Sequence, residues 1–160
     1  MGRRALRYVD VRVSNGVGIV EFRFHRLHSA GDMDMIAEEL NAIARRDDVR
    51  DIVLNCGALD YFPSGFLGIL ADLSRRLREG GRRLAICRMR PEPLRALAVT
   101  RLDTIIPAYA TEEEAIQAMN ARRRSDEQGS RQDRRLDTAH PRPIESREVL
   151  GPPDSSEPGA

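Results

Sequence analysis

The sequence predicts one α/β domain, in which a mixed β-sheet carries its helices mainly on one face. Two observations support this class. Two N-terminal segments alternate apolar and polar residues as strands do, and the rest of the chain alternates amphipathic helical segments with short apolar runs typical of buried strands. That order is expected of helices layered on a sheet. The length of 160 residues suits one domain of about 100 to 150 residues with a tail.

The N-terminal half begins with a predicted hairpin, followed by a helix. Residues 8–14 and 18–24 have the strand pattern, and Asn15 and Gly16 between them suit a tight turn. From Asp32 to residue 44 the apolar residues recur at the spacing of one helix face. These elements supply the first edge of the sheet and the first covering helix.

The next part of the chain predicts alternating strands and helices. Residues 51–55 (DIVLN) form a compact run that we interpret as a central strand. Residues 64–79 have one apolar side and predict a helix that Gly80 and Gly81 end. The remaining predicted elements are a strand over 83–87, a short helix over 91–100, a strand over 104–106, and a helix that Thr111 and Glu114 cap and that reaches about Asn120.

Beyond Asn120 the composition changes to that of a disordered tail. This segment holds five of the nine prolines and no aromatic residue. We therefore divide the chain into an N-terminal extension (1–7), one domain (8–120) and a disordered polar tail (121–160). The arginine triplet 122–124 is interpreted as a solvated helix end, with contact to nucleic acid or lipid headgroups as the alternative.

The overall composition excludes several classes of function. A net charge of +1 gives no field that favours nucleic acid or an anionic membrane, so no direct nucleic-acid contact is expected. No apolar run approaches the roughly 20 residues that span a bilayer, and we see no signal peptide. Cys56 and Cys87 lie in apolar strand-like runs and are expected to be reduced, buried thiols of a cytoplasmic protein. The cysteines and histidines form no metal-ligand pattern, so no metal or cofactor is expected.

The most informative segment is residues 59–70 (LDYFPSGFLGIL), where a strand leads directly into an apolar helix with Ser64 at the joint. Pro63 disfavours helical geometry at Phe62 and has a φ that suits a helix start, so we expect Ser64 to be the N-cap. Gly65 and Gly68 lower helix propensity, which indicates close approach by the sheet or by a partner. Internal packing is the expected reason for Gly68.

Ser64 is also a candidate phosphorylation site. A phosphate at a helix N-terminus meets free amides and the positive end of the helix dipole, so the fold tolerates it. The same phosphate would block a partly apolar contact with another protein. The expected contact surface comprises Asp60, Tyr61, Pro63, Ser64, Gly65 and Phe66, with Asp60 either orienting an arginine of the partner or solvating the loop.

At these residues the chain resembles the STAS family, and especially its bacterial anti-sigma factor antagonists, in which a strand is followed by roughly Asp-Ser-Ser-Gly-Leu-Gly and a helix. Residues 47–55 (DDVRDIVLN) look like the family's central strand, and residues 80–111 resemble its following strand, helix, strand and last helix cap. The resemblance covers about residues 8–120. It implies a STAS-like α/β fold with a mixed sheet.

The resemblance also implies a function. Family members of this type bind an anti-sigma factor that is a serine kinase, which phosphorylates the serine matching Ser64, and a phosphatase restores the binding form. Pro63, Gly65 and Phe66 depart from the family pattern, in which Asp, a second Ser or Thr, and Gly are usual. The alternative is therefore a phosphorylation-independent STAS scaffold or accessory subunit in a stress-signalling or lipid-transport complex.

Catalysis by Ser64 is not expected. Its surroundings lack Gly-x-Ser-x-Gly, and no histidine has a clear reason to be its base. His25 and His28, at the end of the second predicted strand, are interpreted as surface or partner-facing residues. The sequence thus favours a protein-binding regulator, and not an enzyme.

Overall fold

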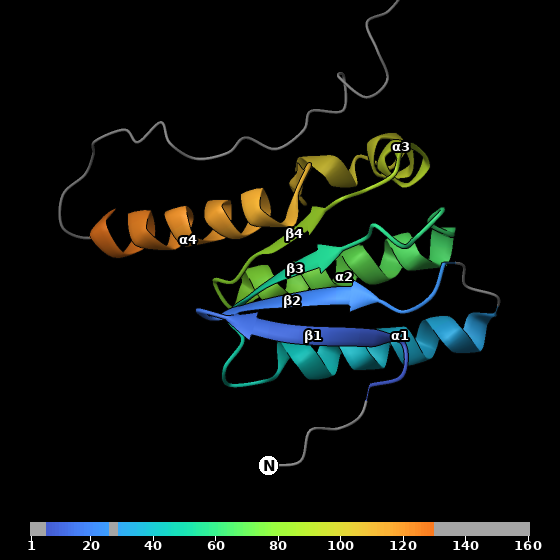
Figure 1. Ribbon diagram of the computed structural model, residues 1–160, viewed down its shortest axis with the longest axis horizontal. Coiled ribbons are helices and arrows are strands. Elements are labelled where there is room, and N and C mark those ends of the chain that lie inside the picture. Colours follow the sequence, from blue (N-terminus) through green and yellow to red (C-terminus); the bar gives the residue numbers. More distant parts are fainter. Residues whose placement is uncertain (1–5, 26–28, 130–160) are drawn as a thin grey trace, which may run out of the picture.

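The structure is a computed structural model that describes residues 6–25 and 29–129. Its centre is a five-stranded sheet in the order β1-β2-β3-β4-β5 (Figure 1). β1 pairs with β2 antiparallel, and the other neighbouring strands are parallel. The strands are β1 (Val9–Ser14), β2 (Val17–Phe22), β3 (Asp51–Asn55), β4 (Leu84–Cys87) and β5 (Ala108–Tyr109). The predicted mixed sheet is confirmed.

The hairpin between β1 and β2 forms where the sequence predicted it. Asn15 and Gly16 have φ values of 50° and 81°. Two successive positive φ angles give the turn a twist that matches the twist of the flanking strands. The hairpin register pairs Ser14 with Val17, which sets the inward-facing side chains of both strands.

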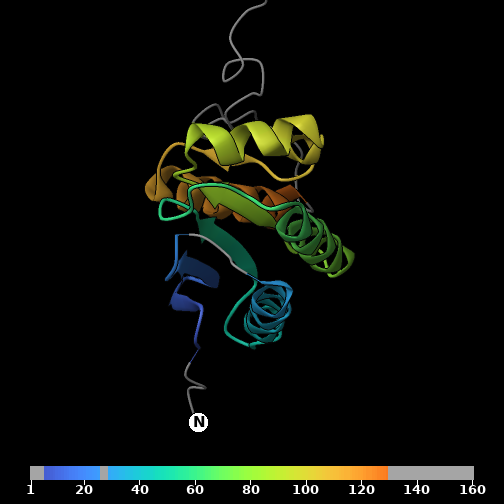
Figure 2. The same ribbon diagram turned by 90° about the vertical axis from the view of Figure 1, so that its right-hand side faces the viewer.

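Three helices accompany the sheet on its first face: α1 (Ala30–Ala44), α2 (Ser64–Glu79) and α3 (Pro91–Val99). Figure 2 shows α1 and α2 side by side on this face. The core between these helices and the sheet contains alternate strand residues, because successive side chains of a strand point to opposite faces. Its members include Val20, Phe22, Ile36, Leu40, Ile52, Leu54, Phe66, Leu70, Leu73, Ile86 and Leu97.

The second face is covered by α4 (Glu112–Gly129). The helix packs Ala115, Ala118 and Met119 against strand residues of the other parity, which form a smaller core. The strand residues of this core are Val17, Ile19, Val53, Ala85, Cys87 and Tyr109. The helices therefore lie mainly on one face, as predicted, and one helix covers the other.

The predicted strand over residues 104–106 is wrong. A short 3-10 helix, η1 (Leu102–Thr104), occupies that place, and β5 begins at Ala108. Ile106 is fully buried, and its amide donates to the carbonyl of Leu102 at 2.8 Å. Ile106 thus reflects core packing in a tight turn and not a strand, and Ile105 beside it is 39% exposed.

The last helix is longer than predicted, since α4 continues nine residues beyond Asn120 to Gly129. Two contacts hold this extension on the domain. Arg123 Nη1 donates to the carbonyl of Asn15 at 2.7 Å, and Arg83 Nη2 pairs with Asp126 at 3.0 Å. The predicted tail boundary at residue 121 therefore falls inside the helix, and residues 130–160 lie outside the described part of the chain.

Candidate functional site

The candidate site lies at the edge of the sheet where the parallel strands β2, β3 and β4 end. Because these strands run the same way, the loops that follow them and the starts of α1, α2 and α3 meet at this edge (Figure 1). We call residues 56–66, which are the loop after β3 and the first turn of α2, the Ser64 corner.

Ser64 is the first residue of α2 and not its N-cap, so the predicted capping role is wrong. Pro63 is the N-cap, in an extended conformation with φ −66° and ψ 156°, and within the described chain no side chain caps this helix. The amides of Phe66 and Leu67 donate to the carbonyl of Pro63 at 2.9 and 3.3 Å. The Ser64 side chain is exposed, which leaves its hydroxyl accessible at the positive end of a helix.

Phe66 is fully buried, which contradicts its predicted place on the partner-facing surface. Its ring packs edge-on against Phe62 and Phe22, with centroid distances of 4.9 and 5.6 Å. This position is three residues into the α2 helix, on the side that faces the sheet. Phe66 therefore anchors the Ser64 corner to the core.

Of the two glycines of α2, Gly65 permits a close approach and Gly68 does not. A Cβ on Gly65 would lie 2.8 Å from Sδ of Met33 in α1, whereas a Cβ on Gly68 would meet nothing within 4 Å in the described chain. Gly65 thus permits close packing of the two helices, and the prediction of internal packing for Gly68 is wrong. Both glycines line a groove of about 250 Å³ between α1 and α2.

Hydrogen bonds from both sides fix the loop of the Ser64 corner. Asp60 forms an ion pair with Arg90 at 3.1 Å, and Arg90 Nε donates to the carbonyl of Gly57 at 3.2 Å. On the other side the Asp60 amide donates to the carbonyl of His25 at 3.2 Å, and His25 Nδ1 lies 2.9 Å from the carbonyl of Ala58. Asp60 therefore orients an arginine of its own chain, and His25 supports the loop. His28 lies outside the described residues.

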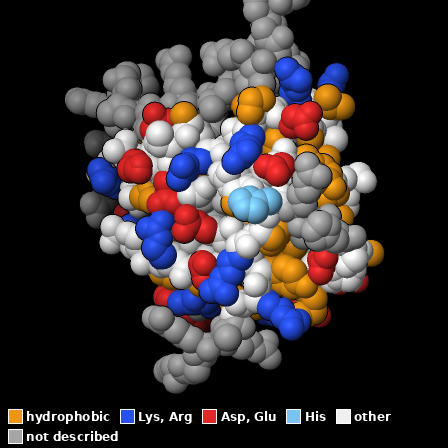
Figure 3. Space-filling model, turned by 45° about the vertical axis from the view of Figure 1, so that its right-hand side comes forward, with side chains coloured by type: hydrophobic (Ala, Val, Ile, Leu, Met, Phe, Trp, Pro, Cys, Tyr) orange, Lys and Arg blue, Asp and Glu red, His pale blue; other side chains and the backbone are white. Residues whose placement is uncertain are grey.

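The outer surface of the corner is partly apolar. Tyr61 retains 39% exposure, Pro63 is half-buried, and Ser64 and Gly65 are exposed. On the face seen in Figure 3, hydrophobic side chains form a band on one side, and charged side chains of both signs occupy the other side. The structure thus brings together Asp60, Tyr61, Pro63, Ser64 and Gly65 of the predicted contact surface and withdraws Phe66.

A polar network links the corner to α4, and the sequence analysis did not find it. Glu112 at the start of α4 accepts hydrogen bonds from Arg12 of β1 and from Asn55 Nδ2, the latter at 2.9 Å. Asn55 Oδ1 accepts from the amide of Gly57 at 3.1 Å. Asn55 is 5% exposed, and the available sequence signal was an asparagine at the end of an apolar strand run.

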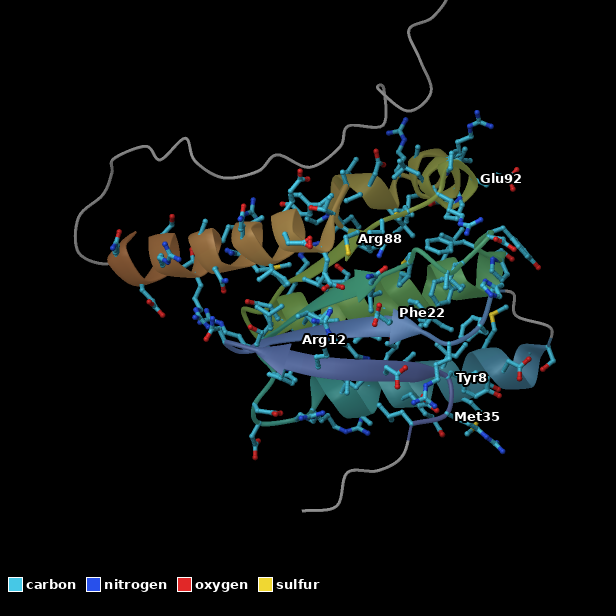
Figure 4. All side chains as sticks on the ribbon, viewed as in Figure 1. Tyr8, Arg12, Phe22, Met35, Arg88 and Glu92 are labelled. Atoms are coloured by element: carbon cyan, nitrogen blue, oxygen red, sulfur yellow. The ribbon has the colours of Figure 1, made fainter. Side chains whose placement is uncertain are left out.

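The charges of this network favour an ionised Glu112. Burial alone would raise the pKa of Glu112, but hydrogen bonds from Arg12 and Asn55 outweigh burial and hold the pKa below its ordinary value. Arg88, in the turn after β4, adds a favourable positive charge, and Figure 4 shows Arg12 and Arg88 on their two segments. Glu112 therefore joins two strands and the start of the Ser64 corner.

Comparison with known proteins places this arrangement in a family. The STAS domain family matches residues 8–115. The chain belongs to the STAS family. The family resemblance seen in the sequence is thereby confirmed.

Solved structures similar to this STAS domain include three of anti-sigma factor antagonists. An anti-sigma-factor antagonist (STAS) domain protein of Planctomyces limnophilus is 26% identical, and the match covers 70% of this chain and 97% of that one with a TM-score of 0.62. The antagonist SpoIIAA in its unphosphorylated form is 21% identical, with 71% and 96% covered and a TM-score of 0.59. Bacillus SpoIIAA in its phosphorylated form is 18% identical, with 68% and 96% covered and a TM-score of 0.53. The comparison with curated proteins finds no match.

The cysteines and the candidate metal ligands of the STAS domain were compared with the predictions. The described residues contain no group of three metal-ligating side chains. Cys56 and Cys87 are buried free thiols, as predicted. Burial raises the pKa of Cys56 well above its ordinary value and that of Cys87 to about 12, so both thiols are protonated at neutral pH. No helix within residues 6–25 and 29–129 is long and apolar enough to cross a membrane.

Proposed function

We propose that this protein is an anti-sigma factor antagonist that binds an anti-sigma factor through the Ser64 corner, and that phosphorylation of Ser64 ends this binding. The observation that carries the proposal is the exposed Ser64 hydroxyl at the uncapped start of α2. A hydroxyl held in a capping bond would be less available to a kinase. Here the hydroxyl is presented to solvent by a corner whose backbone is fixed on both sides.

The unphosphorylated corner suits contact with a protein. Tyr61 and Pro63 offer apolar area beside the small residues Ser64 and Gly65, so a partner's surface can approach the backbone closely. A phosphate on Ser64 would add nearly two negative charges at the centre of this area. The desolvation of that dianion would then oppose the partly apolar contact.

The same phosphate is compatible with the folded domain. Amides at the start of a helix have no acceptor within the helix, and the dipole there is positive. Pro63 contributes no competing side-chain acceptor. Phosphorylation is therefore expected to change the surface of the domain without unfolding α2.

The proposed partner is an anti-sigma factor that is also the serine kinase of Ser64, with a phosphatase that reverses the modification. Binding would sequester the anti-sigma factor and so regulate transcription in the cytoplasm, without catalysis by this chain. Two observations support the assignment: the family is STAS, and the antagonist SpoIIAA, which shares the fold, is known in unphosphorylated and phosphorylated forms.

The proposal is tested by the intact mass of the protein isolated from its own cells, together with capture of its bound partner. Ser29 provides a matched control, because it is also an exposed serine at a helix start on the same edge. We expect a single phosphate that is lost in Ser64→Ala and kept in Ser29→Ala. We also expect Ser64→Glu to bind the partner at least about tenfold more weakly than the unmodified protein, which corresponds to about 1.4 kcal/mol.

The contrary result is an unmodified protein that stays bound to its partner across growth and stress conditions. Equal partner binding by Ser64→Glu and the unmodified protein would count against the switch as well. Either result would favour a phosphorylation-independent scaffold or accessory subunit in a stress-signalling or lipid-transport complex.

A further inference from the structure

A second site lies at the end of the sheet opposite the Ser64 corner. It is a pocket of about 290 Å³ between the last turns of α2, the start of β4, strand β5 and the middle of α4. Its lining includes Arg78, Arg82, Arg83 and Arg122. We call this site the arginine pocket. No part of the proposed switch at Ser64 uses it.

The pocket carries more positive than negative charge. Arg82 donates to three backbone carbonyl oxygens at the end of α1 and before β3, so its charge is held in place without a carboxylate. Arg83 pairs with Asp126 at 3.0 Å. Among the described residues no carboxylate pairs with Arg78 or Arg122. Four arginines thus border the pocket, and among the described residues only the guanidinium group of Arg83 is paired with a carboxylate, so Arg78 and Arg122 are the two that can bind an anion.

Ordinary structural roles explain only part of this cluster. Arg78 lies in the last turn of α2, where a cation is stabilised by the negative end of the helix dipole. Arg122 is exposed in the interior of the 18-residue helix α4, where arginine favours the helix but the helix dipole gives a cation no added stability. A guanidinium group binds phosphate or carboxylate oxygens in two parallel hydrogen bonds. The cluster is therefore suited to an anionic group.

The rest of the lining is largely apolar. Leu84, Ala118 and Met119 are nearly fully buried, and Ile105 retains 39% exposure at the rim. Tyr109 also lines the pocket, and burial raises its pKa although the charge of Arg122 opposes the shift. The phenol is therefore protonated at neutral pH. An apolar wall beside charged groups suits a ligand that has both an apolar part and an anionic part.

We propose that the arginine pocket binds a small molecule that joins an apolar body to a phosphate monoester. The phosphate would pair with Arg78 and Arg122, and the apolar body would pack on the wall that includes Met119 and Ile105. A phosphate monoester carries nearly two charges at neutral pH and so uses the excess of guanidinium groups better than a carboxylate does. The pocket volume of about 290 Å³ admits a compact ligand.

The test is isothermal titration of the full-length protein with phenyl phosphate, inorganic phosphate and benzoate. We expect phenyl phosphate to bind more tightly than either of the other probes. Arg78→Gln and Arg122→Gln should each weaken phenyl phosphate by about 10-fold or more, the usual size for a charge-assisted hydrogen bond. The matched control is Arg124→Gln, an exposed position two residues along α4, which should change affinity by less than about twofold.

The apolar wall is tested separately by Ile105→Ser, at a rim position that is 39% exposed. This variant should weaken phenyl phosphate and leave inorganic phosphate unchanged. Circular dichroism of each variant checks that the fold is kept. The proposal is overturned if phenyl phosphate does not bind, if Arg124→Gln weakens it as much as Arg122→Gln does, or if phosphate and phenyl phosphate bind equally. Binding of single-stranded oligonucleotides alone would also overturn it, in favour of diffuse attraction to polyanions.

Discussion

Ser29 and Ser64 stand at the starts of two helices but use their hydroxyl groups differently. Ser29 Oγ accepts a hydrogen bond from the amide of Asp32 at 3.2 Å, and the Ser29 amide donates one to the Asp32 carboxylate at 3.2 Å. Ser64 already has helical geometry, because the extended Pro63 takes the N-cap position. The two positions therefore differ in what a serine contributes to stability.

We expect Ser29→Ala to lower the free energy of unfolding by about 1 kcal/mol, the usual cost of losing a cap. Ser64→Ala should change it by less than about 0.5 kcal/mol, because alanine suits the first turn of a helix. Urea denaturation of the two variants measures both values. A loss at Ser64 as large as that at Ser29 would show that the Ser64 hydroxyl does cap α2.

Phe66 and Tyr61 separate stability from partner binding. Phe66→Ala removes a fully buried ring from the aromatic cluster, and we expect a loss of about 3–5 kcal/mol in unfolding free energy. Tyr61→Ala, at an exposed position, should cost less than about 1 kcal/mol in stability and yet weaken partner binding. Denaturation and partner capture measure the two effects; full partner affinity in Tyr61→Ala would exclude this side chain from the contact.

The sequence located the Ser64 segment but not the orientation of its side chains. The cap prediction failed by one residue, since Pro63 can serve either as the last extended residue or as the first helical one. Phe66 was placed on the surface because it follows the serine in the chain. The helical spacing of Phe66 with Leu70, Leu73 and Leu77 was the sequence signal that places its ring on the buried side of α2.

At the scale of elements, the packing of α1 on α2 predicts opposite effects for two glycines of α2. Gly68→Ala should stabilise the protein by about 0.5–1 kcal/mol, because its Cβ enters open space and alanine favours the helix. Gly65→Ala should stabilise the protein less than Gly68→Ala does, or destabilise it, because the side chain of Met33 must move. In a Met33→Ala background the clash is absent, so adding Gly65→Ala should raise the unfolding free energy above that of Met33→Ala alone. Thermal or urea unfolding measures each; equal gains at both glycines would contradict this packing.

The Glu112 network predicts a specific dependence of stability on pH. The folded state lowers the pKa of Glu112, so the carboxylate contributes stability above its unfolded pKa of about 4.3 and loses it as the pH falls through the lower folded pKa. We therefore expect the unfolding free energy of Glu112→Gln to fall less between about pH 5 and about pH 2 than that of the unmodified protein. Urea denaturation across this range measures the slopes. Identical slopes in the variant and the unmodified protein would contradict the role of Glu112.

Elements with strong local signals were predicted well. The bounds of β3 and α2 agree with the prediction, because each is a continuous apolar pattern with clear end signals. Local signals failed for α4, whose polar second half resembles a disordered segment in composition. That half is held by Arg83 and by the backbone of the β1–β2 turn, which lie 43 and 108 residues away in the chain.

At the scale of the whole molecule, the two cysteines report on global unfolding. Cys56 and Cys87 are both fully buried, and burial raises the pKa of each thiol. We expect iodoacetamide to modify neither thiol in the native protein at neutral pH and both in urea. Mass spectrometry over time measures this, and rapid labelling of the native protein would reveal local opening at the sheet ends.

The fold class followed from the order of elements, and the placement of α4 on the second face did not. Central strands that are apolar at every position indicate burial on both faces, and residues 52–54 have this pattern. The pattern does not tell which helix covers which face. The Arg12–Glu112–Asn55 network and the arginine pocket both depend on that placement, so both became visible only in three dimensions.

The aromatic anchoring of the Ser64 corner has a consequence for response time. Phe66 ties the first turn of α2 to Phe22 and Phe62 in the core, so the serine sits on a rigid support and no refolding step need follow its modification. Under the proposed function, a cell would change the output of this protein as fast as its kinase and phosphatase act. The fraction of phosphorylated protein would then follow the ratio of kinase to phosphatase activity, and no slow conformational change of the domain would delay its response.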